Sequence, residues 1–124
     1  MASGGIRFDF TAEDNFTQNE FRTVRFVIKD ALGVALTDLT GWKFAWYLFN
    51  QLKDNAAAPA TGALITKTSE AGGITDPPTA PNADVLLLAA DTAGKTAKTY
   101  WYELWRTDGS NDIRLAYGQF PIIN

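Results

Sequence analysis

The chain has 124 residues, of which 46% are hydrophobic and 20% charged, and it contains neither cysteine nor histidine. This length and composition suit a single domain over residues 1–124, with a core that needs no disulfide or metal. The net charge of −3 gives no basic surface for phosphate backbones, which argues against nucleic acid as a partner. Without thiolates or imidazoles, sulfur-ligated zinc is excluded, and so is the most common general base at neutral pH.

Residues 1–20 are expected to form an N-terminal arm with one short strand. Hydrophobic and charged side chains alternate over Ile6–Phe10, as they do in a strand with one buried face, and the polar Ala12–Glu20 is predicted to be a loop. The N-terminus lacks the charged and apolar regions of a signal peptide, and no stretch approaches the roughly 18 apolar residues of a membrane span. We therefore expect synthesis in the cytoplasm and no membrane partner.

Two strands are predicted in the first half of the remaining chain. Phe21–Asp30 shows the clearest alternation, with Val24, Phe26 and Ile28 on its buried face. The glycine-containing segment of residues 31–41 then connects it to the ring-rich strand Trp42–Asn50. One face of that strand, which suits a core, carries Trp42, Phe44, Trp46 and Leu48, and the other carries Ala45, Tyr47 and Phe49.

Shorter elements follow. Residues 51–62 are small and polar and predict a loop, and the proline-rich residues 76–82 exclude a central strand because each proline removes a ladder donor. Ala83–Leu88 is apolar on both faces and fits a buried strand. The other predicted elements are minor strands over Leu64–Thr68 and Gly73–Thr75 and a corner over Ala89–Ala97.

The most informative stretch is Lys98–Arg106 (KTYWYELWR), which is predicted to form the closing hairpin with Ile113–Ile123. Rings occur on both faces of this strand, so one face is expected to pack in the core and the other to meet something else. The residues alone leave open which face is internal. The two sets are Tyr100, Tyr102 and Leu104, and Trp101, Glu103 and Trp105.

Seven or eight short strands with turns between them and no convincing amphipathic helix predict an all-β fold, namely an immunoglobulin-like antiparallel β-sandwich. Either Tyr100 or Tyr102 could form a tyrosine corner, in which the hydroxyl bonds to nearby backbone. This possibility favours their face as the internal one.

Two motifs that resemble ligand sites are explained by turns. Residues 93–96 (AGKT) imitate the end of a phosphate-binding loop, but Ala89 replaces the first glycine and a strand follows where a helix is needed. Asp108, Asn111 and Asp112 carry oxygens, but their spacing is not that of a calcium loop, and Asp108-Gly109 already predicts a hairpin turn. We expect no metal and no cofactor.

The row Trp101, Glu103 and Trp105, with side chains about 7 Å apart along a strand, is the third candidate. Rings beside a carboxylate are typical of carbohydrate-binding surfaces, but also of subunit contacts and core packing. A glycosidase needs two carboxylates across a cleft, and the sequence offers Glu103 no partner. No catalytic residue is predicted, and the chain is not expected to be an enzyme.

Several short motifs occur together between residues 21 and 123. They are a D-L-T-G turn at residues 38–41, a W-x-F strand at Trp42, a Y-x-Y-E-L strand at Tyr100, and an L-x-x-G-x-F strand formed by Leu115, Gly118 and Phe120. This pattern resembles the immunoglobulin-like module of tailed-bacteriophage virion proteins, including the N-terminal domain of baseplate upper proteins and small stand-alone head or tail components. The chain departs from it by an insertion over Asn55–Gly62 and by ending after the last strand.

The resemblance implies a structural protein of the virion, made in the host cytoplasm. A chain of this length looks most like a multicopy capsid decoration or cement protein that binds the major capsid protein or other virion proteins in a homo-oligomeric or symmetric multicopy assembly. A tail or baseplate component is the alternative, and a carbohydrate-binding module the second alternative. The predicted contact residues are Trp101, Glu103, Trp105, Asn55, Pro59, Pro77 and Pro78.

Overall fold

The structure is a computed structural model that describes residues 6–7, 16–17, 21–30, 32–50, 62–109 and 112–123. The predicted predominance of β-structure is confirmed, because strands dominate this part of the chain. In order, the elements are β1 (Ile6–Arg7), β2 (Phe16–Thr17), β3 (Arg22–Ile28), β4 (Phe44–Phe49), β5 (Ile65–Thr68), β6 (Asn82–Leu87), α1 (Ala89–Thr92), β7 (Lys98–Arg106) and β8 (Ile113–Ile123).

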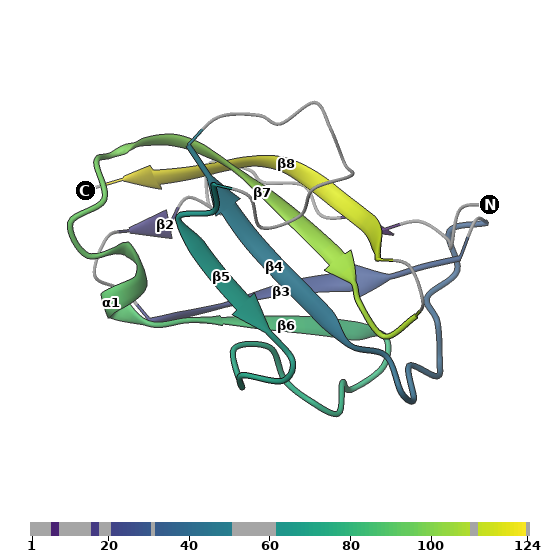
Figure 1. The fold of residues 1–124 in the computed structure, drawn as a ribbon. Helices are drawn as coiled ribbons and strands as arrows, with labels where there is room; N and C mark the ends of the chain where they lie inside the picture. Colours follow the sequence, from purple (N-terminus) through teal and green to yellow (C-terminus); the bar gives the residue numbers. More distant parts are fainter. Residues whose placement is uncertain are drawn as a thin grey trace.

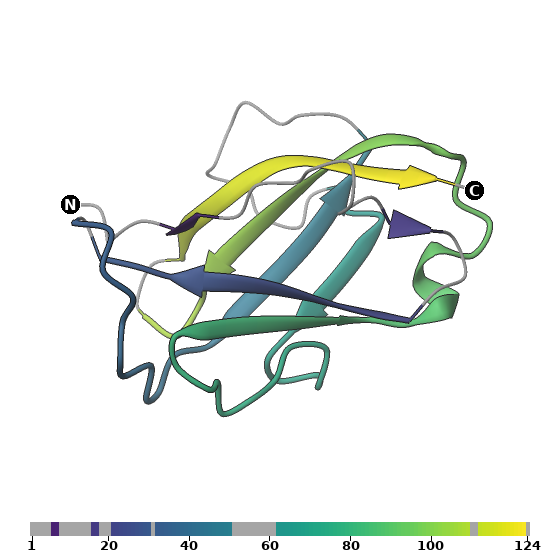
Figure 2. The same cartoon turned by 180° about the vertical axis from the view of Figure 1, so that it is seen from behind.

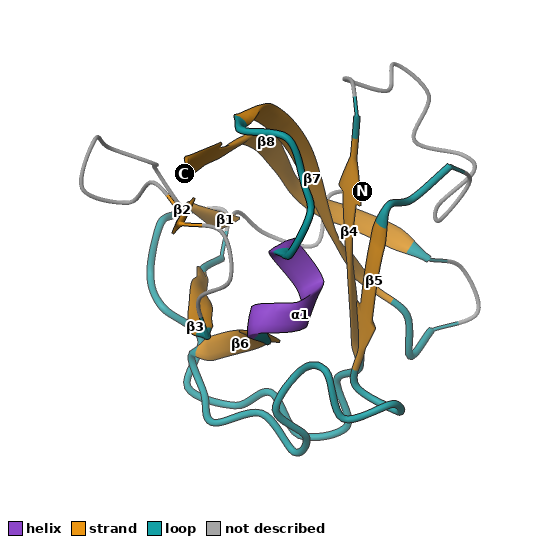
Figure 3. Ribbon diagram, turned by 90° about the vertical axis from the view of Figure 1, so that its left-hand side faces the viewer, coloured by secondary structure: helices purple, strands orange, loops and turns teal. Residues whose placement is uncertain are grey.

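The strands form two sheets that face each other (Figures 1 and 2). The smaller sheet, sheet A, has the order β1-β3-β6, and the larger, sheet B, has the order β2-β8-β7-β4-β5. Neighbouring strands are antiparallel except β2, which runs parallel to the end of β8. Viewed from one end, α1 lies where the chain passes from β6 in sheet A to β7 in sheet B (Figure 3).

Three local features differ from the sequence prediction. β2 lies within the predicted loop of residues 12–20, because a strand of two residues carries no periodicity that a sequence could show. The minor strand predicted at residues 73–75 is reduced to a single bridge between Ile74 and Val85. The predicted corner after β6 contains the four-residue helix α1.

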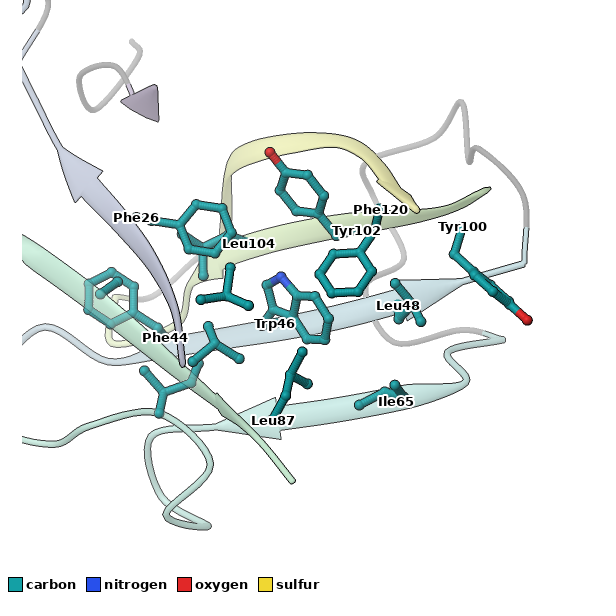
Figure 4. Packing of buried hydrophobic residues seen from close by; sticks show 14 of the residues in the cluster. Phe26, Phe44, Trp46, Leu48, Ile65, Leu87, Tyr100, Tyr102, Leu104 and Phe120 are labelled. Atoms are coloured by element: carbon teal, nitrogen blue, oxygen red, sulfur yellow. The ribbon is translucent and has the colours of Figure 1, made fainter. Parts of the chain in front are cut away.

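The core lies between the two sheets and is built from their inward-facing side chains (Figure 4). Phe26 of β3 meets Tyr102 of β7 with ring centroids 5.4 Å apart, and Trp46 of β4 meets Phe120 of β8 edge-on at 5.3 Å. The face of β7 that carries Tyr100, Tyr102 and Leu104 is therefore the internal one, as its tyrosines suggested.

The D-L-T-G segment forms the expected turn before β4. Asp38 accepts hydrogen bonds through Oδ1 from the backbone N–H of Thr40, at 2.9 Å, and from the Thr40 hydroxyl, and these bonds hold the pKa of Asp38 below its usual value. The N–H of Trp42 then donates to the carbonyl of Leu39 at 3.0 Å, and Gly41 has φ 83°. A positive φ at this third position is what a type II turn requires. Leu39, only 2% exposed, anchors the turn in the core.

The corner between β6 and β7 connects the two sheets. Asp91 of α1 forms an ion pair of 2.6 Å with Lys67 of β5 and also accepts the backbone N–H of Leu88 at 2.7 Å. Shortly afterwards the Tyr100 hydroxyl donates to the carbonyl of Thr96 at 2.8 Å, which confirms the predicted bond between a tyrosine hydroxyl and nearby backbone. The AGKT motif of residues 93–96 thus belongs to a turn that leads into a strand.

Candidate interaction surfaces

The outer face of sheet B carries the predicted row of Trp101, Glu103 and Trp105. Trp101 is half-buried, but Glu103 is only 3% exposed and Trp105 only 2% exposed. The prediction of Glu103 and Trp105 as contact residues is therefore wrong, whereas that of Trp101 stays a prediction. The physical reason is a second apolar cluster on this face, formed by Trp105 with Ala45, Tyr47 and Phe49 of β4 and with Ala63 packed against it.

Glu103 is buried as the acceptor of two side-chain hydrogen bonds. The indole N–H of Trp105 donates to Oε1 at 2.9 Å, and Arg114 of β8 donates to Oε2 at 3.1 Å. The Arg114 guanidinium in turn lies over the Tyr117 ring, 4.1 Å from its centroid. A buried carboxylate persists only when it is paired and hydrogen-bonded, and here both partners fix its position.

Six side chains of β7 and β8 are accessible on this face beside the buried cluster. We call them the β7–β8 strip: Thr99, Trp101, Arg114, Tyr117, Gln119 and Pro121. They point outward because their neighbours along both strands, such as Tyr102 and Phe120, point into the core. Within the strip Trp101 lies opposite Gln119, and Tyr117, 55% exposed, lies opposite the buried Glu103.

Several connections are tied together around Lys43 at one end of the sheets, and we call this region the loop end. It comprises the described residues of 29–43, 75–81 and 107–112. The side-chain ammonium of Lys43 contacts Asp76 Oδ2 at 2.6 Å. The backbone N–H of Lys43 donates to Asp108 Oδ1 at 3.2 Å, and the Lys43 carbonyl accepts the N–H of Thr107 at 2.9 Å. Pro77 is exposed and Pro78 half-buried in this region, so the two contact predictions remain predictions, whereas Asn55 and Pro59 lie outside the described residues.

A tight turn after β3 presents two apolar side chains at the loop end. Asp30 Oδ1 accepts the backbone N–H groups of Leu32, at 2.9 Å, and Val34, at 3.0 Å, and the Asp30 N–H donates to the Val34 carbonyl at 2.9 Å. Leu32 is 89% exposed and Val34 59% exposed. The sequence analysis missed this pair, although Asp30 three residues before Gly33 is a local turn signal.

Of the three residues that carry oxygens near the hairpin turn, Asp108 is already engaged, Asp112 is exposed, and Asn111 lies outside the described residues. Asp108 accepts two hydrogen bonds from Arg106, at 2.8 and 3.0 Å. Across residues that the structure does describe, no group of three carboxylates comes together to hold a metal, and no helix is long and apolar enough to cross a membrane. No family model, curated protein or solved structure matches the chain.

Asp108 makes stability at the loop end dependent on pH. Hydrogen bonds from Arg106 and from the backbone of Lys43 hold its pKa below the ordinary value. The ionised Asp108 therefore contributes fully to the free energy of unfolding above the pKa of an unfolded aspartate, about 3.9. This contribution is lost as the pH falls through the lower pKa that Asp108 has in the folded state. We expect Asp108→Asn to flatten the fall in unfolding free energy on acidification, measured by urea denaturation between neutral pH and the acid limit of folding. An unchanged slope would contradict this assignment.

Proposed function

We propose that the two sheets form an immunoglobulin-like sandwich. Sheet A would supply strands A, B and E of that fold as β1, β3 and β6, and sheet B would supply strands G, F, C and C′ as β8, β7, β4 and β5. The hydroxyl of Tyr100, near the start of β7, supports this correspondence, because a tyrosine corner lies at the start of strand F and bonds to backbone a few residues upstream.

We further propose that the chain is a structural protein of a bacteriophage virion, most simply a capsid decoration protein that attaches to the shell through its loop end. The motif resemblance supplies the class of protein. The observation that carries the attachment is the pair Leu32 and Val34, which stand 89% and 59% exposed on a turn fixed by four hydrogen bonds. A tail or baseplate component of the same fold is the alternative, and the same surface would serve there.

The rigidity of the loop end favours attachment through it. Burying an exposed leucine in a partner is favourable by about 1.5–3 kcal/mol, and little of this is lost when the side chain already stands on an ordered turn. The neighbouring connections are also fixed, through Lys43, so the loop end has a defined shape before it meets a partner. If copies are linked in a homo-oligomer, avidity would strengthen this modest contact further.

The test is co-sedimentation of the purified protein with purified capsid shells. We expect the wild type to bind at a fixed ratio and the double variant Leu32→Ser, Val34→Ser to lose at least about tenfold in affinity, since two buried apolar groups contribute more than 1.4 kcal/mol. The variant should stay folded because both side chains are exposed. Leu64→Ser, at an apolar side chain 45% exposed just before β5, is the matched control.

The possible outcomes of this experiment test separately which residues attach the protein and where in the virion it is located. A double variant that binds shells like the wild type would exclude Leu32 and Val34 as contacts while leaving the decoration role. A wild type that ignores shells but co-sediments with tails or baseplates would move the protein to the alternative location. Loss of binding in Leu64→Ser as well would show that removing any exposed apolar side chain weakens binding, and that the contact is not specific to the loop end.

A further inference from the structure

We propose that the β7–β8 strip binds a neutral pyranose sugar, stacked on Trp101 and Tyr117. This inference does not rest on the proposed attachment, since the strip and the pair Leu32 and Val34 share no residue. It also differs from the row predicted from sequence, because two members of that row are buried.

The aromatic spacing comes from the strand register. Trp101 pairs with Gln119 and Glu103 with Tyr117, so Trp101 and Tyr117 are diagonal neighbours on two adjacent strands. Diagonal side chains of an antiparallel pair lie about 7–8 Å apart, close enough for one small ring system to touch both. A sugar ring has an apolar face of C–H groups that packs on such flat side chains, while its hydroxyl groups point sideways.

Polar groups for those hydroxyls lie beside the rings. Gln119 is exposed and its amide offers both a donor and an acceptor. Arg114 gives one hydrogen bond to Glu103, and the described structure records no other for it, so its remaining N–H groups can donate to a ligand. Because Glu103 and the Tyr117 ring already hold the guanidinium, little conformational entropy is lost when a ligand binds.

The charge and size of the strip select the ligand. The charge of Arg114 is balanced by the buried Glu103 beneath the strip, and the other five members of the strip are uncharged, so the strip carries no net charge that would favour an ionic partner. A standard protein interface uses about 20–30 residues on each side. Six residues match the footprint of a few sugar rings better. Among the described residues, the one charged side chain of the strip is thus already paired with Glu103, which favours a neutral glycan over a charged peptide.

The test uses the indole N–H signals of the full chain labelled with ¹⁵N, titrated with cellotriose and with maltotriose. We expect a saturable shift of the Trp101 signal with at least one of them, at a millimolar Kd, while the signal of the fully buried Trp46 stays in place. Tyr117→Ser should weaken binding at least about tenfold, whereas Tyr117→Phe, which keeps the ring, and Leu32→Ser, at the loop end, should keep it.

Three results would overturn the proposal. The first is the absence of a saturable shift with both neutral trisaccharides. The second is tighter binding of trigalacturonate, which would mean that the strip selects a charge. The third is unchanged affinity in Tyr117→Ser, whose fold is checked by the unshifted Trp46 signal. None of these results bears on attachment through the loop end, which the co-sedimentation experiment tests with different variants.

Discussion

Arg114→Met is expected to lower the free energy of unfolding by about 2–4 kcal/mol, because it leaves a buried carboxylate without its cation. The Glu103 side chain is 4% exposed and would keep only the hydrogen bond from the Trp105 indole. Methionine retains most of the apolar length of arginine, so the loss reports the missing charge rather than a large cavity. Urea denaturation followed by circular dichroism measures it.

A second substitution shows how much of this loss is due to the buried charge of Glu103. In the Arg114→Met background, Glu103→Gln should recover at least half of the loss, because a neutral amide oxygen still accepts the Trp105 N–H while no charge remains buried. Additive effects of the two substitutions would contradict this coupling. Arg25→Met is the matched control: it removes an arginine whose side chain is 58% exposed in its pair with Asp84, and its effect should be much smaller.

The two strands of the closing hairpin could be predicted because alternation of side chains is a local property. Lys98–Arg106 and Ile113–Ile123 have the predicted bounds, and the inward face of β7 followed from its tyrosines. The rings on both faces of β7 predicted an outer face that meets something else, whereas Glu103 and Trp105 on that face are buried among side chains of the chain itself. The neighbours of these two residues follow from the pairing of β7 with β4, which brings Ala45 beside Trp105 and Tyr47 beside Glu103. That pairing joins residues about sixty positions apart, and no local pattern specifies it.

The candidate surfaces could not be predicted for the same reason, because they too depend on contacts between distant parts of the chain. Tyr117 and Arg114 can be recognised as part of a surface site only once β8 places them beside Glu103. A bulge at Leu104/Trp105 also shifts the register there. Leu32 and Val34 belong to a turn whose residues a sequence can recognise, but their exposure depends on how the whole turn projects from the sheets. A turn motif predicts backbone geometry, whereas a contact surface is a property of the assembled fold.

Gly118→Val is expected to destabilise the fold by about 2–3 kcal/mol, which gives a physical reason for the glycine in the L-x-x-G-x-F motif. Gly118 lies opposite Tyr102, and a Cβ on it would stand 3.1 Å from Tyr102 Cε2. That ring is 3% exposed and packs on Phe26, so it has little room to retreat. Alanine requires a shift of a few tenths of an ångström and should cost less than valine. Thermal and urea denaturation of both variants measure the difference.

A substitution at Gly41 measures the cost of backbone strain without steric crowding, for comparison with Gly118. Gly41 has φ 83° and no heavy atom within 4 Å of an added Cβ, so Gly41→Ala should cost about 1–2 kcal/mol through its conformation alone. A Tyr102→Leu background removes the ring above Gly118 and should reduce the cost of Gly118→Val by at least half, while leaving the cost of Gly41→Ala unchanged. If Gly118→Val costs as much with leucine at position 102 as with tyrosine, the glycine is required by the backbone of β8 and not by the ring that covers it.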